Sequence, residues 1–245
     1  MRSDVSQLPK IKGVADIVFL LDATGSMGPC INAVKQNIKT FVQTFTTPTP
    51  NGSAVVKDWR AKVVGYRDLD YIDFPAMVDN PFVSSVSELE AQLNELVADG
   101  GGDEPETLLE ALYMLANMPA TGSDEPLRPD AWRHVNAGRR FVIVFTDAPF
   151  KEPLRLPRDA KIDDVILNLM TAKIVLHMFA PASLARFGVL EEVDKALWHK
   201  VPMNSGETAQ KALEDYTADQ SKFEKIIQLL AKTMTQQSAD VPAAD

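Results

Sequence analysis

The segment from Asp16 to Met27, DIVFLLDATGSM, constrains the fold of this chain more than any other segment. Its apolar run from Ile17 to Leu21 is typical of a parallel strand that is buried on both faces of a sheet. The run ends at Asp22, at the carboxyl end of the expected strand, where open α/β sheets bind their ligands. A helical pattern begins a few residues later. This order predicts an α/β fold around a buried parallel sheet.

Oxygen-bearing side chains occupy every second position of the loop that follows this strand. They are Asp22, Thr24 and Ser26. In one tight loop these side chains can converge on a single point, and ligands that are all oxygen suit a hard divalent cation such as Mg²⁺. The alternative is a polar strand-to-helix turn in which Thr24 or Ser26 only caps the helix.

Strand and helix patterns alternate along the rest of the chain. We expect further strands at 60–66, 76–83, 140–147, 173–179 and 198–203, and helices at 31–45, 87–98, 107–117, 162–171, 184–197 and within 207–234. The segment at 76–83 is interrupted by a proline, which suits the edge of a sheet. This alternation predicts a three-layer, Rossmann-like, doubly wound and mostly parallel sheet with helices on both faces.

No internal repeat or linker divides the chain. We therefore expect one domain over residues 13–235, between polar tails at 1–12 and 236–245. No apolar run approaches the roughly 20 residues of a membrane span, and the polar amino terminus lacks a signal-peptide segment. These features lead us to expect a cytoplasmic protein.

Composition narrows the function classes. The chain is 45% hydrophobic and 24% charged, as in globular proteins, and its net charge is −9. Such an acidic surface argues against non-specific binding to nucleic acid or to anionic membranes. The single cysteine, Cys30, excludes an internal disulfide, and we expect it to be a buried packing residue. His177 lies within an expected buried strand, where a hydrogen-bonded core histidine is expected.

Two motifs carry a family resemblance. Asp22-Ala-Thr24-Gly-Ser26 resembles the Asp-x-Ser/Thr-x-Ser motif of the von Willebrand factor type A domain, which forms a metal-ion-dependent adhesion site in that family. Thr146-Asp147 resembles the Thr-Asp that ends the fourth family strand, whose aspartate usually binds the metal through water. Because a buried carboxylate requires a partner, Asp147 supports the site independently of the first motif. Its other interpretation is a helix cap or a loop salt bridge.

The middle segment departs from the common family pattern, because Asp103 stands where most members have a threonine after a Gly-Gly pair. The order Asp103-Glu104-Pro105-Glu106 is similar to the loop of integrin β-subunit type A domains. That resemblance implies that Glu106 is a direct ligand and that Asp103 lies beside the cation or holds a second one. Aligning the glycines instead makes Asp103 the direct ligand. Asp68 and Asp70 either join Asp103 around a second cation or are solvated loop charges.

Four ordered segments, at 21–29, 64–68, 100–106 and 147–149, also resemble the type A domains found beside α-kinase domains in some eukaryotic proteins. The resemblance does not extend to the kinase itself, because no Gly-rich phosphate loop with a following lysine is present.

The resemblance implies a non-enzymatic protein-binding module, serving as a scaffold or a subunit of a complex. It would hold Mg²⁺, or Mn²⁺ or Ca²⁺ because of the additional carboxylate, and a partner's Asp or Glu would complete the coordination shell. One rival is a metal-dependent hydrolase of the haloacid dehalogenase type, which requires a carboxylate as general acid/base at position 24, where Thr24 stands. Another is a degenerate domain that binds no metal.

Overall fold

The computed structural model of the chain describes residues 13–47, 56–69, 75–101 and 105–239. Its centre is a sheet of the strands β1 (Val14–Asp22), β2 (Asp58–Tyr66), β3 (Met77–Asp79), β4 (Arg139–Phe145), β5 (Ile174–Pro181) and β6 (Leu197–Val201). The strand order is β3-β2-β1-β4-β5-β6. All neighbours are parallel except β2 and β3. The expected mostly parallel sheet, with the 76–83 segment at its edge, is thus confirmed.

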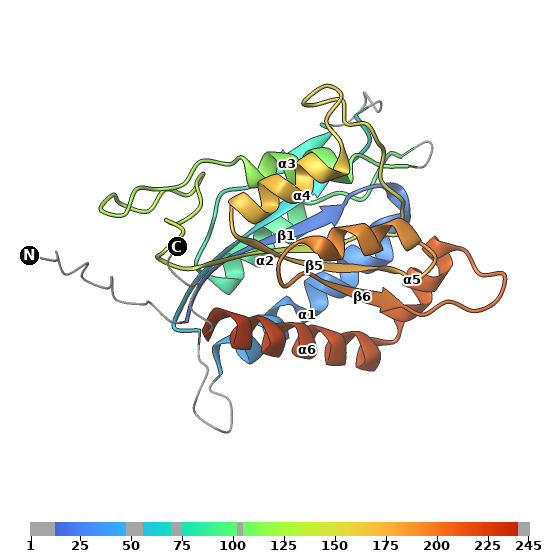
Figure 1. Cartoon of the computed structure of the whole chain (residues 1–245). Helices are drawn as coiled ribbons and strands as arrows, with labels where there is room; N and C mark the ends of the chain where they lie inside the picture. Colours follow the sequence, from blue (N-terminus) through green and yellow to red (C-terminus); the bar gives the residue numbers. More distant parts are fainter. Residues whose placement is uncertain (1–12, 48–55, 70–74, 102–104, 240–245) are drawn as a thin grey trace, which may run out of the picture.

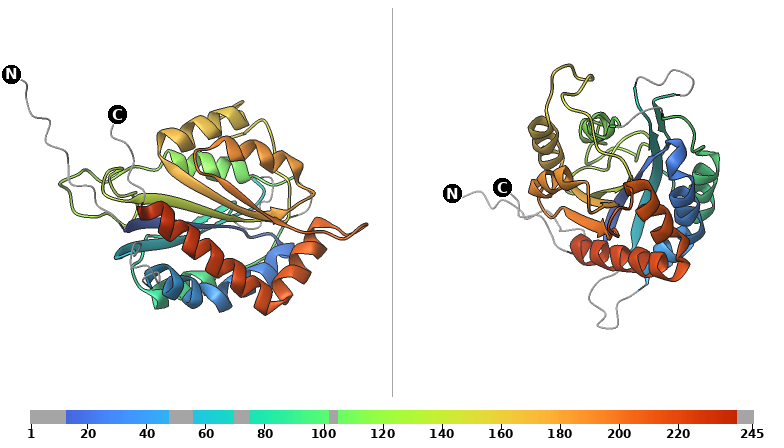
Figure 2. Two further views of the ribbon diagram at one scale, coloured as in Figure 1. Left: turned by 60° about the horizontal axis from the view of Figure 1, so that its bottom comes forward. Right: turned by 90° about the vertical axis from the view of Figure 1, so that its right-hand side faces the viewer.

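Helices cover both faces of the sheet (Figures 1 and 2). One face packs against α1 (Gly28–Thr46), α2 (Val86–Glu95), α5 (Ala209–Ala218) and α6 (Gln220–Ala239). The other face packs against α3 (Leu108–Ala116), α4 (Ile162–Thr171) and the 3₁₀ helix η2 (Ala185–Glu192). A short 3₁₀ turn, η1 (Gly25–Met27), joins β1 to α1. This is the doubly wound arrangement that the alternating patterns predict.

Alternation along β1 explains the two cores. Phe19 and Leu21 point into the core beneath α1, whereas Val18 and Leu20 point into the core beneath α3 and α4. Because both faces of the strand are covered, a continuous apolar run is the sequence that buries best here. Asp22 ends the strand on the same side as Val18 and Leu20, since side chains alternate along a strand.

Two expectations for the last third of the chain need correction. The helix expected at 184–197 is wrong, because this segment forms only the 3₁₀ helix η2 and then turns into β6. Gly188 lies in the middle of η2 and Lys195 adopts a positive φ of 62°, and both disfavour a continuous α-helix. The helix α6 continues to Ala239, so residues 236–239, expected in a tail, are helical. Residues 1–12 and 240–245 lie outside the described residues.

None of the helices in the described part of the chain combines the length and the apolar character that a membrane span requires.

Candidate metal centre

The candidate ligands gather at the carboxyl ends of β1 and β4, on the side of the sheet where the loop after β4, drawn in yellow, rises in Figure 1. Backbone hydrogen bonds tie the loops together there. Gly25 N donates to Gly100 O at 2.9 Å, and Ala23 N donates to Tyr66 O at 2.9 Å. These bonds hold the first loop against the middle loop and the end of β2 at one edge of the sheet.

Close polar contacts link four of the predicted site residues. Asp22 Oδ1 accepts from Thr24 N at 3.0 Å and from Thr24 Oγ1 at 2.6 Å. Thr24 Oγ1 lies 3.3 Å from Ser26 Oγ, and Ser26 Oγ donates to Asp147 Oδ1 at 3.2 Å. Asp22 and Asp147 are 125 residues apart in sequence, yet the hydroxyl groups of Thr24 and Ser26 lie between them.

Thr146 completes the surroundings of Asp22. Its Oγ1 donates to Asp22 Oδ2 at 2.8 Å and accepts from Ala148 N at 3.1 Å. Sequence reasoning recognised Thr146 only as part of a motif and did not predict this contact. The contact follows from the register of β1 and β4, which pairs Leu21 with Phe145 and so places Thr146 beside Asp22.

Glu106 joins the site from the middle loop. Its backbone is fixed beside the last motif, because Glu106 N donates to Pro149 O and Lys151 N donates to Glu106 O, both at 2.8 Å. Its side chain is 3% exposed. A Cβ added to Gly101 would lie 2.9 Å from Thr24 Cβ and 3.5 Å from Glu106 Oε1, so Thr24 and Glu106 border the same small space.

The charge of Asp22 lacks a basic partner in hydrogen-bond contact among the described residues. Burial raises the pKa of this carboxyl, while the bonds from Thr24 and Thr146 and the charge of Arg67 lower it. Since burial dominates, the charged form is under-compensated by the protein alone. A bound cation would supply the missing compensation.

Arg67 holds the surrounding loops. It is 2% exposed, and its guanidinium donates to the carbonyl oxygens of Pro75, Val97 and Asp99. Thr107 Oγ1 in turn donates to Arg67 O. Val97 and Asp99 come from a segment that is distant in sequence, so the residues next to Arg67 do not predict these contacts.

The expected second cation site is only partly described. Asp68 is 2% exposed and forms an ion pair with Lys151, so it is not a solvated loop charge. This pairing balances the Asp68 carboxylate with a side chain of the protein. Asp70 and Asp103 lie outside the described residues, so the roles predicted for them stay predictions.

The donor set fits a hard divalent cation. Asp22, Thr24, Ser26, Glu106 and Asp147 offer only oxygen atoms, the ligands that Mg²⁺ and Ca²⁺ prefer. Within the ranges that the structure describes, no group of three or more His, Cys, Asp or Glu side chains is arranged to hold a metal ion. A cation here would therefore rely on the hydroxyl oxygens of Thr24 and Ser26.

Cys30 and the histidines lie outside this ligand set. Cys30 is buried in the first turns of α1, and burial together with the charges of Asp147 and Asp22 raises the pKa of its thiol. The expected packing role is confirmed. His177 is fully buried, as predicted, with Nδ1 at 3.2 Å from His199 Nε2 and Nε2 at 2.9 Å from Gln237 Oε1.

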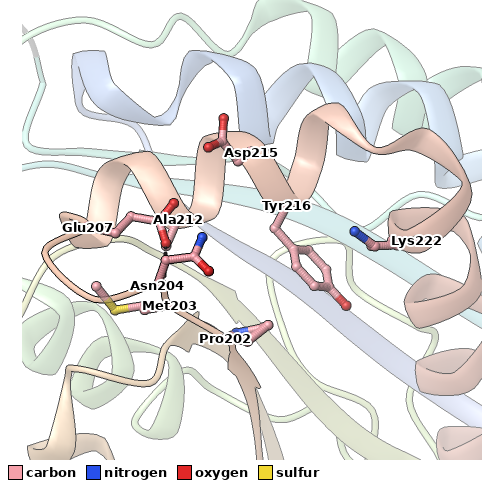
Figure 3. Close-up of a pocket in the computed structure, with 8 residues that line it drawn as sticks. All are labelled: Pro202, Met203, Asn204, Glu207, Ala212, Asp215, Tyr216 and Lys222. Atoms are coloured by element: carbon pink, nitrogen blue, oxygen red, sulfur yellow. Dashed lines mark hydrogen bonds between the residues drawn. The ribbon is translucent and has the colours of Figure 1, made fainter.

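A separate pocket of about 230 Å³ lies between the segment after β6 and the helices α5 and α6 (Figure 3). Asn204, Asp215, Tyr216 and Lys222 are among the side chains around it. Asn204 N donates to Glu207 Oε2 at 2.6 Å at its rim. None of the candidate metal ligands lines this pocket, and the sequence patterns gave no signal for it.

Residues 16–125 match the von Willebrand factor A domain. The matched region begins in β1 and contains the first and middle motifs. This part of the chain is therefore similar to a kind of domain that generally mediates protein–protein interactions.

Two known proteins are similar in sequence to parts of this chain. The chain is 35% identical over 149 residues to the human von Willebrand factor A domain-containing protein 7 and 30% identical over 95 residues to an ariadne-like RING finger protein of Acanthamoeba polyphaga mimivirus. The alignments cover 61% and 39% of this chain but only 14% and 9% of those proteins. The relatives are thus several times longer than the region they share with it.

Solved structures with similar backbones include the pilus adhesin SpaC from Lactobacillus rhamnosus GG and proximal thread matrix protein 1 from the mussel byssus. The sequence identities are 13% and 14%, and the TM-scores 0.48 and 0.49. The similarity covers 89% and 90% of this chain and 31% and 46% of those chains.

Proposed function

We propose that this chain is a cation-dependent protein-binding module. In this proposal Asp22, Thr24, Ser26 and Glu106 hold Mg²⁺, and Asp147 acts through a bound water. Mn²⁺ or Ca²⁺ could take its place, because Glu106 adds a carboxylate to the ligands. An Asp or Glu side chain of a partner protein completes the coordination shell. Asp103, from the same middle loop, remains the alternative direct ligand.

One observation carries the proposal. Asp22 is completely buried, and its hydrogen-bond donors are the neutral groups of Thr24 and Thr146. A buried carboxylate normally has a charged partner. The hydroxyl groups of Thr24 and Ser26 continue from Asp22 toward Asp147, so the place where positive charge is missing is also the place where oxygen ligands converge.

The outer rim of the site suits the approach of a partner. Gly25 and Gly101 are exposed, and Ser26 is half-buried, whereas Asp22 and Thr24 lie beneath them. The neighbouring loop over residues 148–159 presents Leu156, which is 65% exposed, and the exposed Arg158. This loop is a candidate surface for partner specificity, since contacts around the carboxylate rather than the cation must distinguish one partner from another.

We propose a binding module rather than an enzyme. Ser26 Oγ contacts Asp147 and Thr24, and no histidine is among these partners to activate it as a nucleophile. Thr24, which donates to Asp22, cannot serve as the general acid/base that a haloacid dehalogenase-type phosphatase needs at this position. A cytoplasmic scaffold or complex subunit, with no nucleic-acid or membrane partner, is the setting we infer for this activity.

Calorimetric titration of the metal-stripped protein with Mg²⁺, Mn²⁺ and Ca²⁺ tests the proposal. We expect saturable binding to the wild-type protein and none to Asp22→Ala. The matched control is Asp159→Asn, which also removes one negative charge from a neighbouring loop. Asp159 is exposed and has a φ of 65°, a conformation that asparagine tolerates. Absence of binding to the wild-type protein, or equal binding to Asp22→Ala, would contradict the proposal.

A capture experiment then tests the partner's role. A partner retained by the wild-type chain in Mg²⁺ should be released by a chelator and should not be retained by Asp22→Ala. A partner whose retention survives both changes would bind elsewhere on the molecule and would favour a structural domain that needs no metal.

A further inference from the structure

Tyr66 stands in a row with two residues of the candidate site. It is the last residue of β2, and the β1–β2 register pairs it with Asp22. On the other side of β1, the register places Thr146 beside Asp22. Val64, Leu20 and Val144, two residues before each of these positions, all belong to the core beneath α3 and α4. The three side chains therefore share one face, at the carboxyl ends of three neighbouring strands.

The hydroxyl group of Tyr66 is buried beside the carboxylates of the site. Tyr66 is 0% exposed, and its Oη makes no hydrogen bond of acceptable geometry with any described residue. Burial, together with the charges of Asp22, Glu106 and Asp147, raises the pKa of Tyr66, while the nearby Thr146 hydroxyl lowers it. The phenol therefore stays protonated, and the charges of all three carboxylates act on it.

A buried hydroxyl group without a partner is costly. Leaving such a group unsatisfied destabilises a protein by about 1–3 kcal/mol, whereas an apolar group of the same shape avoids this loss. Phenylalanine would fill the same space, and phenylalanines already pack elsewhere along this sheet, as at Phe19 and Phe145. An unsatisfied phenol beside the candidate site therefore requires an explanation.

We propose that Tyr66 is a positioning residue of the candidate cation site and that its hydroxyl group holds a water molecule of the cation's coordination shell. This inference rests on the proposed function. Mg²⁺ keeps several of its waters when it binds to proteins. A tyrosine hydroxyl both donates and accepts, so it can accept from a cation-bound water and donate to a site carboxylate. Because Tyr66 is fully buried, it acts from the inner side, away from the exposed rim.

Tyr66→Phe separates this role from simple packing. In the metal-stripped protein we expect the free energy of unfolding to stay the same or to rise, because the substitution removes an unsatisfied buried hydroxyl group. We expect Mg²⁺ affinity, measured by calorimetry, to fall about tenfold, as when groups that orient metal ligands are removed. The matched control is Tyr113→Phe, which removes a hydroxyl group from the half-buried Tyr113 on α3 and should change neither quantity.

A tyrosine with a purely structural role would give the opposite result in both measurements, unfolding free energy and Mg²⁺ affinity. If Tyr66→Phe destabilises the metal-stripped protein and leaves Mg²⁺ affinity unchanged, the inference is wrong while the proposed function stands. If the wild-type protein itself binds no cation, the proposed function fails first, and the inference falls with it. Lower affinity at undiminished stability is the result that supports the role of Tyr66.

Discussion

Two aspartates on the same strand show how differently one residue type is used in this molecule. Asp16 and Asp22 lie near opposite ends of β1 and are 1% and 0% exposed. Asp16 accepts from Arg60 Nε at 2.9 Å and Arg60 Nη2 at 2.6 Å, and Arg133 Nε lies 3.3 Å away. Among the described residues, the hydrogen-bond donors to Asp22 are two threonines. The protein neutralises the first carboxylate with its own arginines, and we propose that a bound cation neutralises the second.

In our proposal this difference separates a structural end of the sheet from a functional end. At the amino end, the side chains of Arg60 and Arg133 neutralise the charge of the Asp16 carboxylate. Hydrogen bonds from Arg60 and from the backbone N–H of Arg133 bind its two oxygen atoms. At the carboxyl end, hydroxyl groups satisfy the hydrogen bonds of Asp22 without neutralising its charge. Burial depth alone does not distinguish these two uses. The charge of the partners does.

The largest expected effect comes from breaking the structural end. Asp16→Asn leaves Arg60 and Arg133 buried without their anion, and we expect a loss of about 3–5 kcal/mol in the free energy of unfolding, measured by urea denaturation. The control is Asp58→Asn, because Asp58 also contacts Arg133 but its side chain is 57% exposed. That substitution should cost less than about 1 kcal/mol. Equal losses for the two variants would show that the Asp16 cluster is not a stabilising unit.

A third buried polar cluster predicts the pH dependence of stability. Burial lowers the pKa of His177 to about 4, and burial also lowers that of His199. In the unfolded chain the histidine pKa is near 6.5. Between pH 6.5 and 4, His177 is therefore protonated in the unfolded chain and neutral in the folded chain. Stability is therefore complete above pH 6.5 and falls as the pH drops toward 4, by on the order of 3 kcal/mol from His177.

Urea denaturation between pH 7 and pH 4 measures this loss. The pKa of Asp22 is raised, so its contribution to stability increases as the pH falls, opposite to that of His177. The effect of His177 is therefore isolated by comparing the wild type with His177→Gln. The neutral amide keeps hydrogen-bonding capacity but does not titrate, and the decline should become shallower. His134→Gln, on the loop before β4, is the control and should follow the wild type. Parallel declines for wild type and His177→Gln would exclude His177 as the cause.

A smaller effect is expected from crowding the functional end. Gly101 has a φ of +83°, and a Cβ there would lie 2.9 Å from Thr24 Cβ and Cγ2. Gly101→Ala should displace Thr24 and weaken Mg²⁺ binding about tenfold, or about 1.4 kcal/mol. Gly206 has a φ of +82° with nothing within 4 Å of the same added atom. Gly206→Ala should therefore show only the backbone strain, about 1–2 kcal/mol of stability, with unchanged affinity.

The smallest effect is expected at Cys30, which neighbours the site without contributing a ligand. Its buried thiol, with a raised pKa, should not react with a thiol reagent until the protein unfolds. Cys30→Ala should cost about 1 kcal/mol of stability and should leave Mg²⁺ affinity within about twofold. Rapid labelling of the native protein, or a large loss of affinity, would place the thiol in the site.

The local parts of this structure could be predicted from sequence. The apolar run before Asp22 and the regular spacing of apolar residues in 31–45 predict β1 and α1, because burial on two faces or on one face leaves distinct patterns. The first loop of the site was predictable for the same reason: Asp22, Thr24 and Ser26 lie within five residues of one another.

Pairings between distant segments could not be predicted. Arg133 contacts Asp16, which is 117 residues away in sequence, and Lys151 contacts Asp68, which is 83 residues away. No local sequence pattern predicts either contact. The place of Tyr66 beside Asp22 depends on strand register, which a single sequence leaves open. Likewise, the run of apolar residues at 184–197 predicted a helix, but tertiary packing shaped it into η2 and β6.

The free energy of unfolding of Asp22→Asn, measured in urea with and without saturating Mg²⁺, tests the contrast between the two ends most directly. Without metal, this variant should be as stable as the wild type or more stable, because it removes a buried uncompensated charge. At Mg²⁺ one hundred times its dissociation constant, the wild type should gain about 2.7 kcal/mol and the variant nothing. An Asp22→Asn protein that loses stability without metal as Asp16→Asn does, or that gains the wild-type increment with Mg²⁺, would contradict the functional assignment of Asp22.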